Sequence, residues 1–128
     1  MPREPGSPGD WLRFARSDLA IARVPVAGDV LREALCFHAQ QAAEKSLKAV
    51  LLKLGIAHPR THNLKTLLSL LPQSLAVPPD VAASAELSDY AVTARYPGEF
   101  EEVTEAEHQE ALRLAETVVA WASAVVGS

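Results

Sequence analysis

Aromatic residues and cysteine are both scarce in this chain, and each scarcity excludes a class of protein. The single cysteine among 128 residues excludes an intrachain disulfide, so nothing in the sequence requires an oxidising compartment. Aromatic side chains make up only 5% of the residues, whereas apolar residues make up 48%. The core must therefore be built mainly from alanine, leucine and valine, a composition that favours closely packed helices.

Glycine and long apolar runs are rare as well. The six glycines are too few to separate the strands of a large sheet, and few segments alternate between apolar and polar residues. A membrane span needs about eighteen uninterrupted apolar residues, and no stretch of the sequence is that long. The first ten residues lack the apolar centre of a signal peptide. We therefore expect an all-α cytoplasmic protein that does not enter a membrane.

The net charge of −4 limits the kinds of partner. A protein that coats nucleic acid regardless of sequence needs a broad basic surface, which this composition does not provide. A small local basic cleft remains compatible with it. The length is enough for one domain with a core and too short for two.

Breakers and capping residues divide the chain into a leader and five predicted helices. Residues 1–9 are rich in proline, glycine and serine and are expected to form a flexible leader, so that residues 10–128 form one domain. Asp10, Asp29 and Asn63 are predicted N-caps, and Thr104 with Glu107 has the spacing of a capping box. The predicted helices cover residues 11–24, 30–54, 64–72, 78–95 and 105–126.

The predicted helix 30–54 is the longest buried element and is expected to be the spine of the domain. At about 1.5 Å per residue it spans about 35–40 Å. Its apolar residues fall on two opposite sides, which predicts neighbours on both and, with a second copy, a homodimer. Glu44 and Lys48 are four residues apart in the favourable order, and we expect this pair to be solvated.

His38, Gln41 and Lys45 interrupt the apolar pattern of the spine helix along one side. They would form a polar pocket or a self-association surface if that side were covered, because buried polar groups need hydrogen-bonding partners. Alternatively, the histidine fills space while the glutamine and lysine extend to solvent, as long amphipathic side chains commonly do.

His58, Arg60 and His62 form a second cluster in the predicted loop after the spine helix. Two histidines four residues apart suit zinc on a helix, but Pro59 lies between them and no carboxylate or thiol is near in sequence. His62 is more simply an anchor between the loop and the next helix. A histidine and an arginine before a helix can also hold a phosphate.

Arg95 and Tyr96 form a third candidate, at the break before the last helix. The arginine can bind a phosphate and the tyrosine can stack on a base. The structural alternative is a corner of the bundle held by an ion pair with one of the glutamates that follow. No Ser-His-Asp pattern and no glycine-rich phosphate loop is present, and no cofactor is expected.

Three segments together resemble the HEPN family (higher eukaryote and prokaryote nucleotide-binding domains). They are FHAQQAAEKSLKAVLLKLGI at 37–56, THNLKTLL at 61–68 and ARYP at 94–97. The resemblance implies an up-and-down bundle of about five helices that dimerises. It also implies a frequent pairing with a minimal nucleotidyltransferase encoded nearby, in a toxin–antitoxin system.

Many HEPN members are metal-independent ribonucleases, and the resemblance implies an active-site arginine followed after four to six residues by a histidine near the last helix. Arg95 occupies that region, but His108 lies thirteen positions further on. Arg32 and His38 match the spacing on the wrong helix, and we treat the match as chance. Arg95 is thus a catalytic candidate without its histidine.

These patterns lead to one main hypothesis and two alternatives. The main hypothesis is a homodimer that binds a nucleotide or RNA and pairs with a nucleotidyltransferase. The alternatives are a HEPN ribonuclease toxin and a non-catalytic helical adaptor. The candidate ligand-binding residues are His62, Arg95, Tyr96, His38, Lys45 and Arg60.

Overall fold

A computed structural model describes residues 6–91 and 102–127, and within these ranges every regular element is a helix, without strands. The expected all-α class is confirmed. The elements in chain order are α1 (Pro8–Ala22), α2 (Arg32–Lys53), α3 (Leu64–Ser69), α4 (Pro79–Ala83), the 3₁₀ helix η1 (Ser84–Ala91) and α5 (Glu105–Gly127). Among the described residues, no helix is both long enough and apolar enough to cross a membrane.

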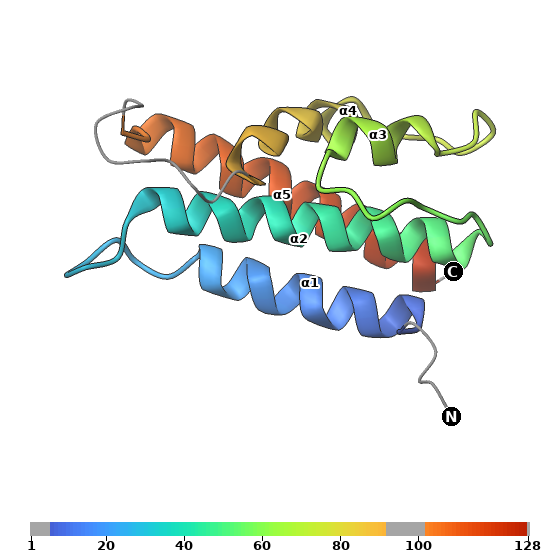
Figure 1. Cartoon of the computed structure of the whole chain (residues 1–128), viewed down its shortest axis with the longest axis horizontal. Helices are drawn as coiled ribbons and strands as arrows, with labels where there is room; N and C mark the ends of the chain where they lie inside the picture. The colour runs from blue at the N-terminus through green and yellow to red at the C-terminus, as the bar shows by residue number, and fades with distance from the viewer. Residues whose placement is uncertain (1–5, 92–101, 128) are drawn as a thin grey trace.

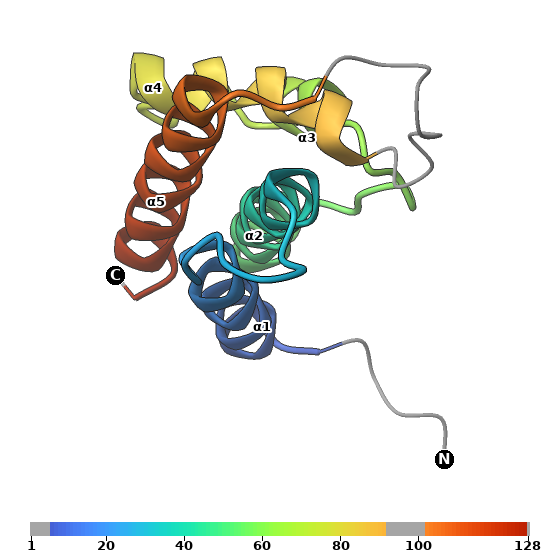
Figure 2. The same cartoon turned by 90° about the vertical axis from the view of Figure 1, so that its left-hand side faces the viewer.

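Helix α2 is the centre of the bundle, as the sequence predicts for the spine. The colour gradients in Figure 1 show α1 antiparallel to α2 and α5 parallel to it. In the end-on view of Figure 2, α1 lies below α2, α3 and η1 lie above it, and α5 flanks one side. No described helix covers the side opposite α5, which is bordered by the segment between α2 and α3.

The burial pattern of α2 agrees with this arrangement. Its alanines allow neighbouring helices to approach closely, and Leu47, Leu51 and Cys36 are fully buried in the main core cluster. The partly exposed positions after the first turn of α2 are Phe37, His38, Gln41, Lys45 and Leu52. They recur at helical spacing and mark the uncovered side of the helix.

The N-terminus of α1 differs from the prediction. Ser7, not Asp10, is the N-cap, and the two residues form a capping box in which each side chain accepts a hydrogen bond from the other's backbone N–H at 3.1 Å. Pro8 occupies the first turn, where its missing N–H is not needed. Asp10 is therefore the third residue of the helix, and α1 begins inside the segment expected to be the leader.

Helix α2 also starts later than predicted. Its N-cap is Leu31, without a side-chain hydrogen bond, so the predicted cap at Asp29 is wrong. Gly28 adopts a positive φ of 60° in a turn that includes Asp29, and the helix begins only after this turn. The predicted end is confirmed, because Gly55 follows the helix with a φ of 73°.

The remaining helix boundaries follow local signals more closely. The Asn63 side chain accepts a hydrogen bond from the backbone N–H of Lys65, and Thr104 and Glu107 form the predicted capping box. The predicted fourth helix is split, because α4 tightens into η1 at Ser84, whose hydroxyl donates to the Val81 carbonyl.

Candidate functional site

Glu44 lies on α2 and is almost completely buried, with 3% of its side chain exposed. One carboxylate oxygen accepts hydrogen bonds from His62 Nδ1 at 2.9 Å and from Gln40 Nε2 at 3.1 Å. The other accepts from Lys48 Nζ at 2.9 Å. The expectation of a solvated Glu44–Lys48 pair is therefore wrong, because the segment after α2 and the first turn of α1 cover it.

The pKa of Glu44 reflects this arrangement. Burial alone raises the pKa of a carboxyl group, but the hydrogen bonds from Lys48, Gln40 and His62 outweigh it and hold the Glu44 pKa below its ordinary value. Glu44 is therefore ionised at neutral pH and can only accept hydrogen bonds. His62 Nδ1 must carry the proton between the two residues.

His62 is the exposed end of this network. Its side chain is 71% exposed, and its backbone carbonyl accepts a second hydrogen bond from Gln40 Nε2 at 3.0 Å. With Nδ1 bound to Glu44, the imidazole has a fixed tautomer and its Nε2 is the atom left for a ligand. Three buried side chains, Gln40, Glu44 and Lys48, thus hold one exposed histidine.

A second carboxylate holds the other histidine of the α2 face. Asp18 on α1 accepts from His38 Nδ1 at 2.9 Å through one oxygen and from Lys45 Nζ at 2.6 Å through the other. Asp18 is buried, whereas His38 and Lys45 remain partly exposed. The structure therefore does not support the view of His38 as a space-filling side chain.

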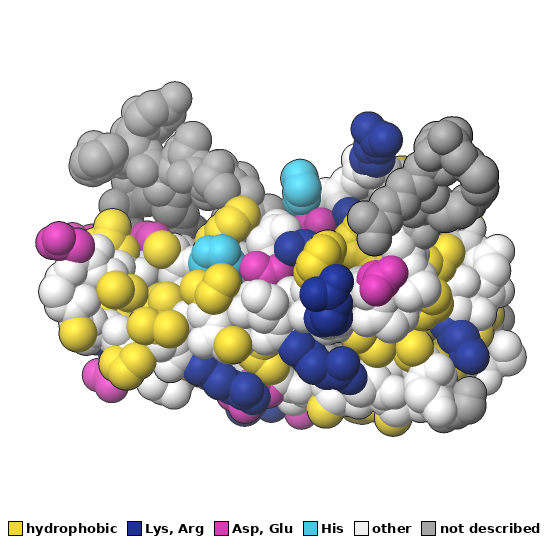
Figure 3. Space-filling view, turned by 90° about the horizontal axis from the view of Figure 1, so that it is seen from below, with side chains coloured by type: hydrophobic (Ala, Val, Ile, Leu, Met, Phe, Trp, Pro, Cys, Tyr) yellow, Lys and Arg dark blue, Asp and Glu magenta, His cyan; other side chains and the backbone are white. Residues whose placement is uncertain are grey.

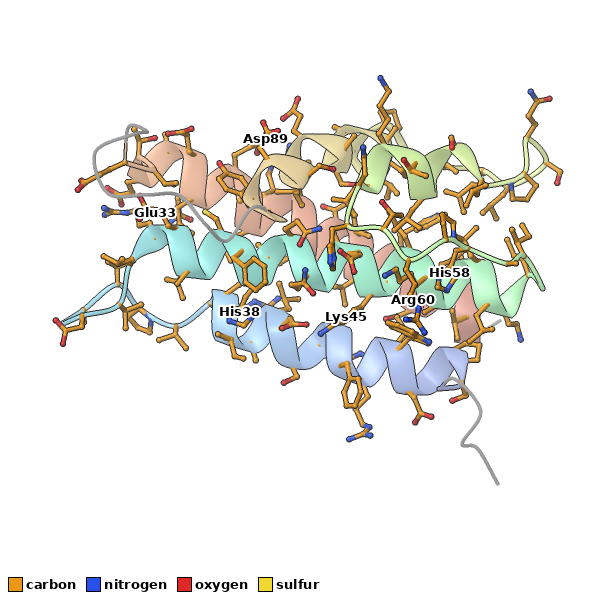
Figure 4. The ribbon with its side chains drawn as sticks, viewed as in Figure 1. Glu33, His38, Lys45, His58, Arg60 and Asp89 are labelled. Carbon is orange, nitrogen blue, oxygen red and sulfur yellow. The ribbon has the colours of Figure 1, made fainter. Side chains whose placement is uncertain are left out.

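His38, Lys45 and His62 form a row, which we call the histidine–lysine row. His38 and Lys45 are two helical turns apart on α2. His62 is hydrogen-bonded to Glu44, the residue before Lys45. Figure 3 shows two histidine side chains on one face, each next to an acidic side chain. Figure 4 shows His38, Lys45, Arg60 and His58 in that order along α2.

Gln41 lies beside this row and contacts the network through Gln40. Its Nε2 donates to Gln40 Oε1 at 2.8 Å, so Gln40 uses both ends of its amide. The adjacent glutamines of the sequence thus have different roles. Gln40 is buried and holds Glu44 and His62, whereas Gln41 is partly exposed and orients Gln40.

The loop before α3 contributes His58 and Arg60. His58 packs edge-on against Trp11 of α1, with ring centroids 6.1 Å apart and an interplanar angle of 86°. Arg60 is exposed and forms no ion pair with the described residues. Within residues 6–91 and 102–127, no three acidic, histidine or cysteine side chains gather as a metal site.

Arg95 and Tyr96, the candidates from the third cluster, lie outside the described residues. His108 lies near the start of α5 with its side chain in the core, and its Nε2 has no hydrogen-bonding partner among the described residues. Arg32 and His38 are about 120° apart around α2 because their spacing is six residues, and His38 is bound to Asp18. The formal match at Arg32 therefore does not form a pair.

A separate hollow between η1 and α5 has the wrong charge for a phosphate. Its lining includes Glu86, Asp89, Glu107 and Glu110, with Tyr90 and apolar side chains between them. Arg113 binds Glu110 at 2.6 Å and also binds Asp80, so part of this acidity is neutralised. The histidine–lysine row is the more suitable surface for an anionic ligand.

Sequence reasoning missed the partners that create the row. Asp18 stands out in no sequence pattern, and Glu44 is expected from the sequence to be solvated. The available signal was the Gln-Gln-Ala-Ala-Glu-Lys run at 40–45, because helix formation alone does not require these polar residues in a buried helix.

Comparison with known proteins agrees with the fold and the sequence segments. The model of the HEPN domain matches residues 9–125. The structure of TT1696 from Thermus thermophilus is 34% identical, with a TM-score of 0.78, covering 92% of this chain and 97% of that one. ST0689, an archaeal HEPN homologue, is 29% identical with a TM-score of 0.73, covering 95% and 99%. No curated protein matches. This chain therefore belongs to the HEPN domain family.

Proposed function

We propose that this protein is a homodimer that binds a nucleotide or RNA through the histidine–lysine row. The observation that carries the proposal is the pair of histidines that carboxylates hold by Nδ1 on one face of the bundle. With Nδ1 bound, each histidine has Nε2 left for a ligand, and this atom can donate to a phosphate when the ring is protonated or accept from a ribose hydroxyl when it is neutral.

The charge balance supports a local anion site in an acidic protein. Lys45 and Lys48 offset Asp18 and Glu44, so these four groups sum to zero. Arg60 then gives the face a net positive charge, and protonation of His38 or His62 would increase it. An arginine beside histidines suits phosphate oxygens, because its guanidinium can donate two parallel hydrogen bonds.

Binding of a short single-stranded RNA tests the proposal. His62→Ala and Lys45→Ala should each weaken binding about tenfold, the loss expected from a charge-assisted hydrogen bond. Lys53→Ala is the matched control, because Lys53 is an exposed lysine at the end of the same helix. Equal affinity of all four proteins would contradict a role for the row.

The dimer is supported by the uncovered side of α2 and by exposed apolar residues near its start. Ile21, Val24 and Leu31 are each at least 40% exposed. Light scattering at tens of micromolar protein should give a particle of twice the chain mass. A strictly monomeric mass would contradict the dimer, whatever the result of the RNA titration.

The partner we propose is a minimal nucleotidyltransferase encoded beside this gene. The support is membership of the HEPN family together with a surface suited to phosphates. After co-expression of the two genes, the two proteins should elute together as a complex in size-exclusion chromatography. A nucleotidyltransferase that elutes alone at every ratio would contradict this pairing.

A metal-independent ribonuclease is the second candidate, favoured by the Glu44–His62 pair. An imidazole held by a buried carboxylate is suited to act as a general base through Nε2, taking the proton of a 2′-hydroxyl. Incubation with RNA in EDTA should then give cleavage that His62→Ala and Arg95→Ala both abolish. RNA that remains intact while bound would support binding alone.

A further inference from the structure

Trp11 and His58 lie beside the histidine–lysine row and belong to no site described so far. We infer that this aromatic pair is a stacking subsite for the base of a nucleotide whose phosphate binds at His62 and Arg60. The inference rests on the proposed function and specifies its ligand. The bound molecule would be a mononucleotide or single-stranded RNA, not a bare phosphate or a duplex.

The first argument is the connection between Trp11 and His62. Trp11 comes from the first turns of α1, and Lys48 Nζ lies 5.6 Å from its ring centroid. Lys48 binds Glu44, and Glu44 binds His62. A chain of three contacts therefore joins the aromatic ring to the outward imidazole, so the two candidate contacts for one ligand are held in a fixed relation.

The second argument is the shape of the aromatic pair. The rings of Trp11 and His58 stand at 86° with centroids 6.1 Å apart, and both side chains are partly exposed. Two rings at a right angle form a corner in which a planar base can lie flat on one ring and meet the other with its edge. Stacking of this kind accepts any base, since every base has a π-face.

The third argument is that hydrogen bonding does not explain the position of either ring. Trp11 Nε1 is buried and has no acceptor among the described residues, whereas Trp121 Nε1 donates to the Ala76 carbonyl at 3.3 Å. Among the described residues, the only hydrogen-bonding contact of the His58 ring is a long one of 3.5 Å from Nδ1 to the Pro59 carbonyl. Packing against the apolar cluster around Ala49 and Val50 accounts for the position of the Trp11 ring, but the buried donor without an acceptor still destabilises the fold.

A single strand fits this corner better than a duplex. The bases of a duplex are already stacked on one another, and duplex binding depends mainly on many phosphate contacts over a basic surface. The net charge of −4 does not provide such a surface. Arg60, two residues from His58, can reach a phosphate while the base lies on the rings.

Fluorescence of Trp11 provides a direct test. The chain has two tryptophans, so Trp121→Phe leaves Trp11 as the only indole. This variant is titrated with adenosine 5′-monophosphate, ribose 5-phosphate and adenosine. We expect the nucleotide to quench Trp11 and to bind about tenfold more tightly than ribose 5-phosphate, the gain typical of one stacked base.

Two substitutions at Trp11 separate stacking from folding. Trp11→Phe keeps an aromatic ring and should keep most of the preference for the nucleotide, measured by calorimetry. Trp11→Leu keeps an apolar side chain without a ring and should bind both phosphates equally. His58→Ala should reduce the preference as well, while binding of ribose 5-phosphate stays unchanged.

The outcomes distinguish the subsite from the function on which it rests. Equal affinity for nucleotide and ribose 5-phosphate, without quenching, overturns the subsite and leaves phosphate binding intact. Adenosine that quenches as strongly as the nucleotide supports the subsite and overturns the phosphate site. Absence of binding by all three compounds overturns both proposals.

Discussion

Glu44 holds His62 Nδ1 at 2.9 Å across eighteen positions of sequence, from the centre of the longest buried helix to a surface loop. The contact fixes both the tautomer of the histidine and the course of the segment that precedes α3. Lys48 and Gln40 bind the same carboxylate, so it has a partner on each side. Buried charges are tolerated when they are paired in this way.

Glu44→Gln should destabilise the protein by about 3 kcal/mol, since breaking one partner of a buried pair leaves the other charge uncompensated. The amide would have to turn an N–H group toward Lys48 or toward His62, both of which are donors. The free energy of unfolding in urea measures the loss. Glu86→Gln, at an exposed position of η1, is the control and should change it little. Equal stability of both variants would contradict the network.

The depressed pKa of Glu44 predicts a loss of stability in acid. In the unfolded chain its carboxyl has the ordinary pKa of 4.5, so the unfolded state takes up this proton first as the pH falls. The stabilisation is fully present above that value and is lost as the pH falls through the lower pKa of the folded state. Urea unfolding from pH 7 down to pH 3 should show a steeper fall for the wild type than for Glu44→Gln. Parallel curves would disprove the assignment to Glu44.

Asp18→Asn should loosen α1 from α2. Asp18 is the acceptor for both His38 and Lys45, and the neutral amide offers one oxygen in place of two charged ones. The two side chains remain partly exposed and can be solvated, so the expected loss is smaller than at Glu44, about 1–2 kcal/mol. Asp29→Asn, at an exposed turn, is the matched control. A loss as small as that of the control would show that the contact contributes nothing.

Ser7→Ala tests the corrected start of α1. The serine side chain accepts from Asp10 N in the capping box, and loss of a cap destabilises by about 1 kcal/mol. If Asp10 were the N-cap, as its sequence context suggested, Ser7 would lie outside the helix and its replacement would be neutral. Ser74→Ala, in an exposed connection, controls for the loss of a hydroxyl. Equal urea midpoints would restore the sequence-based assignment.

The sequence-based predictions are correct where the interacting residues are close in sequence and wrong where they are distant. Asn63 and the Thr104–Glu107 pair were predicted correctly because their partners lie within three residues. Glu44 was assigned to solvent because its burial depends on the segment after α2 folding back. The helical pattern of one element cannot reveal what covers it. Family resemblance identified the polar run, but not the roles of its members.

The candidate site has the same limit. His38, Lys45 and His62 were singled out because polar residues interrupted an apolar pattern or clustered in a loop. Asp18 gave no such signal, because an acidic residue on the outer helix looks like any solvated charge. The contacts that make these residues a row join three separate elements, and only the packed structure brings those elements together.

Gln40→Met should separate the positioning of His62 from the chemistry of His62. Gln40 donates to both Glu44 and the His62 carbonyl, and methionine keeps a similar volume without hydrogen bonds. The loop before α3 should open more readily, seen as faster amide hydrogen exchange at Leu64 and Lys65. Ligand affinity should fall while the His62 side chain is still present. Gln109→Met is the matched control, because Gln109 is an exposed glutamine on α5. Unchanged exchange in Gln40→Met would mean that Glu44 alone holds the loop, whereas faster exchange with unchanged affinity would mean that the ligand does not depend on the position of His62.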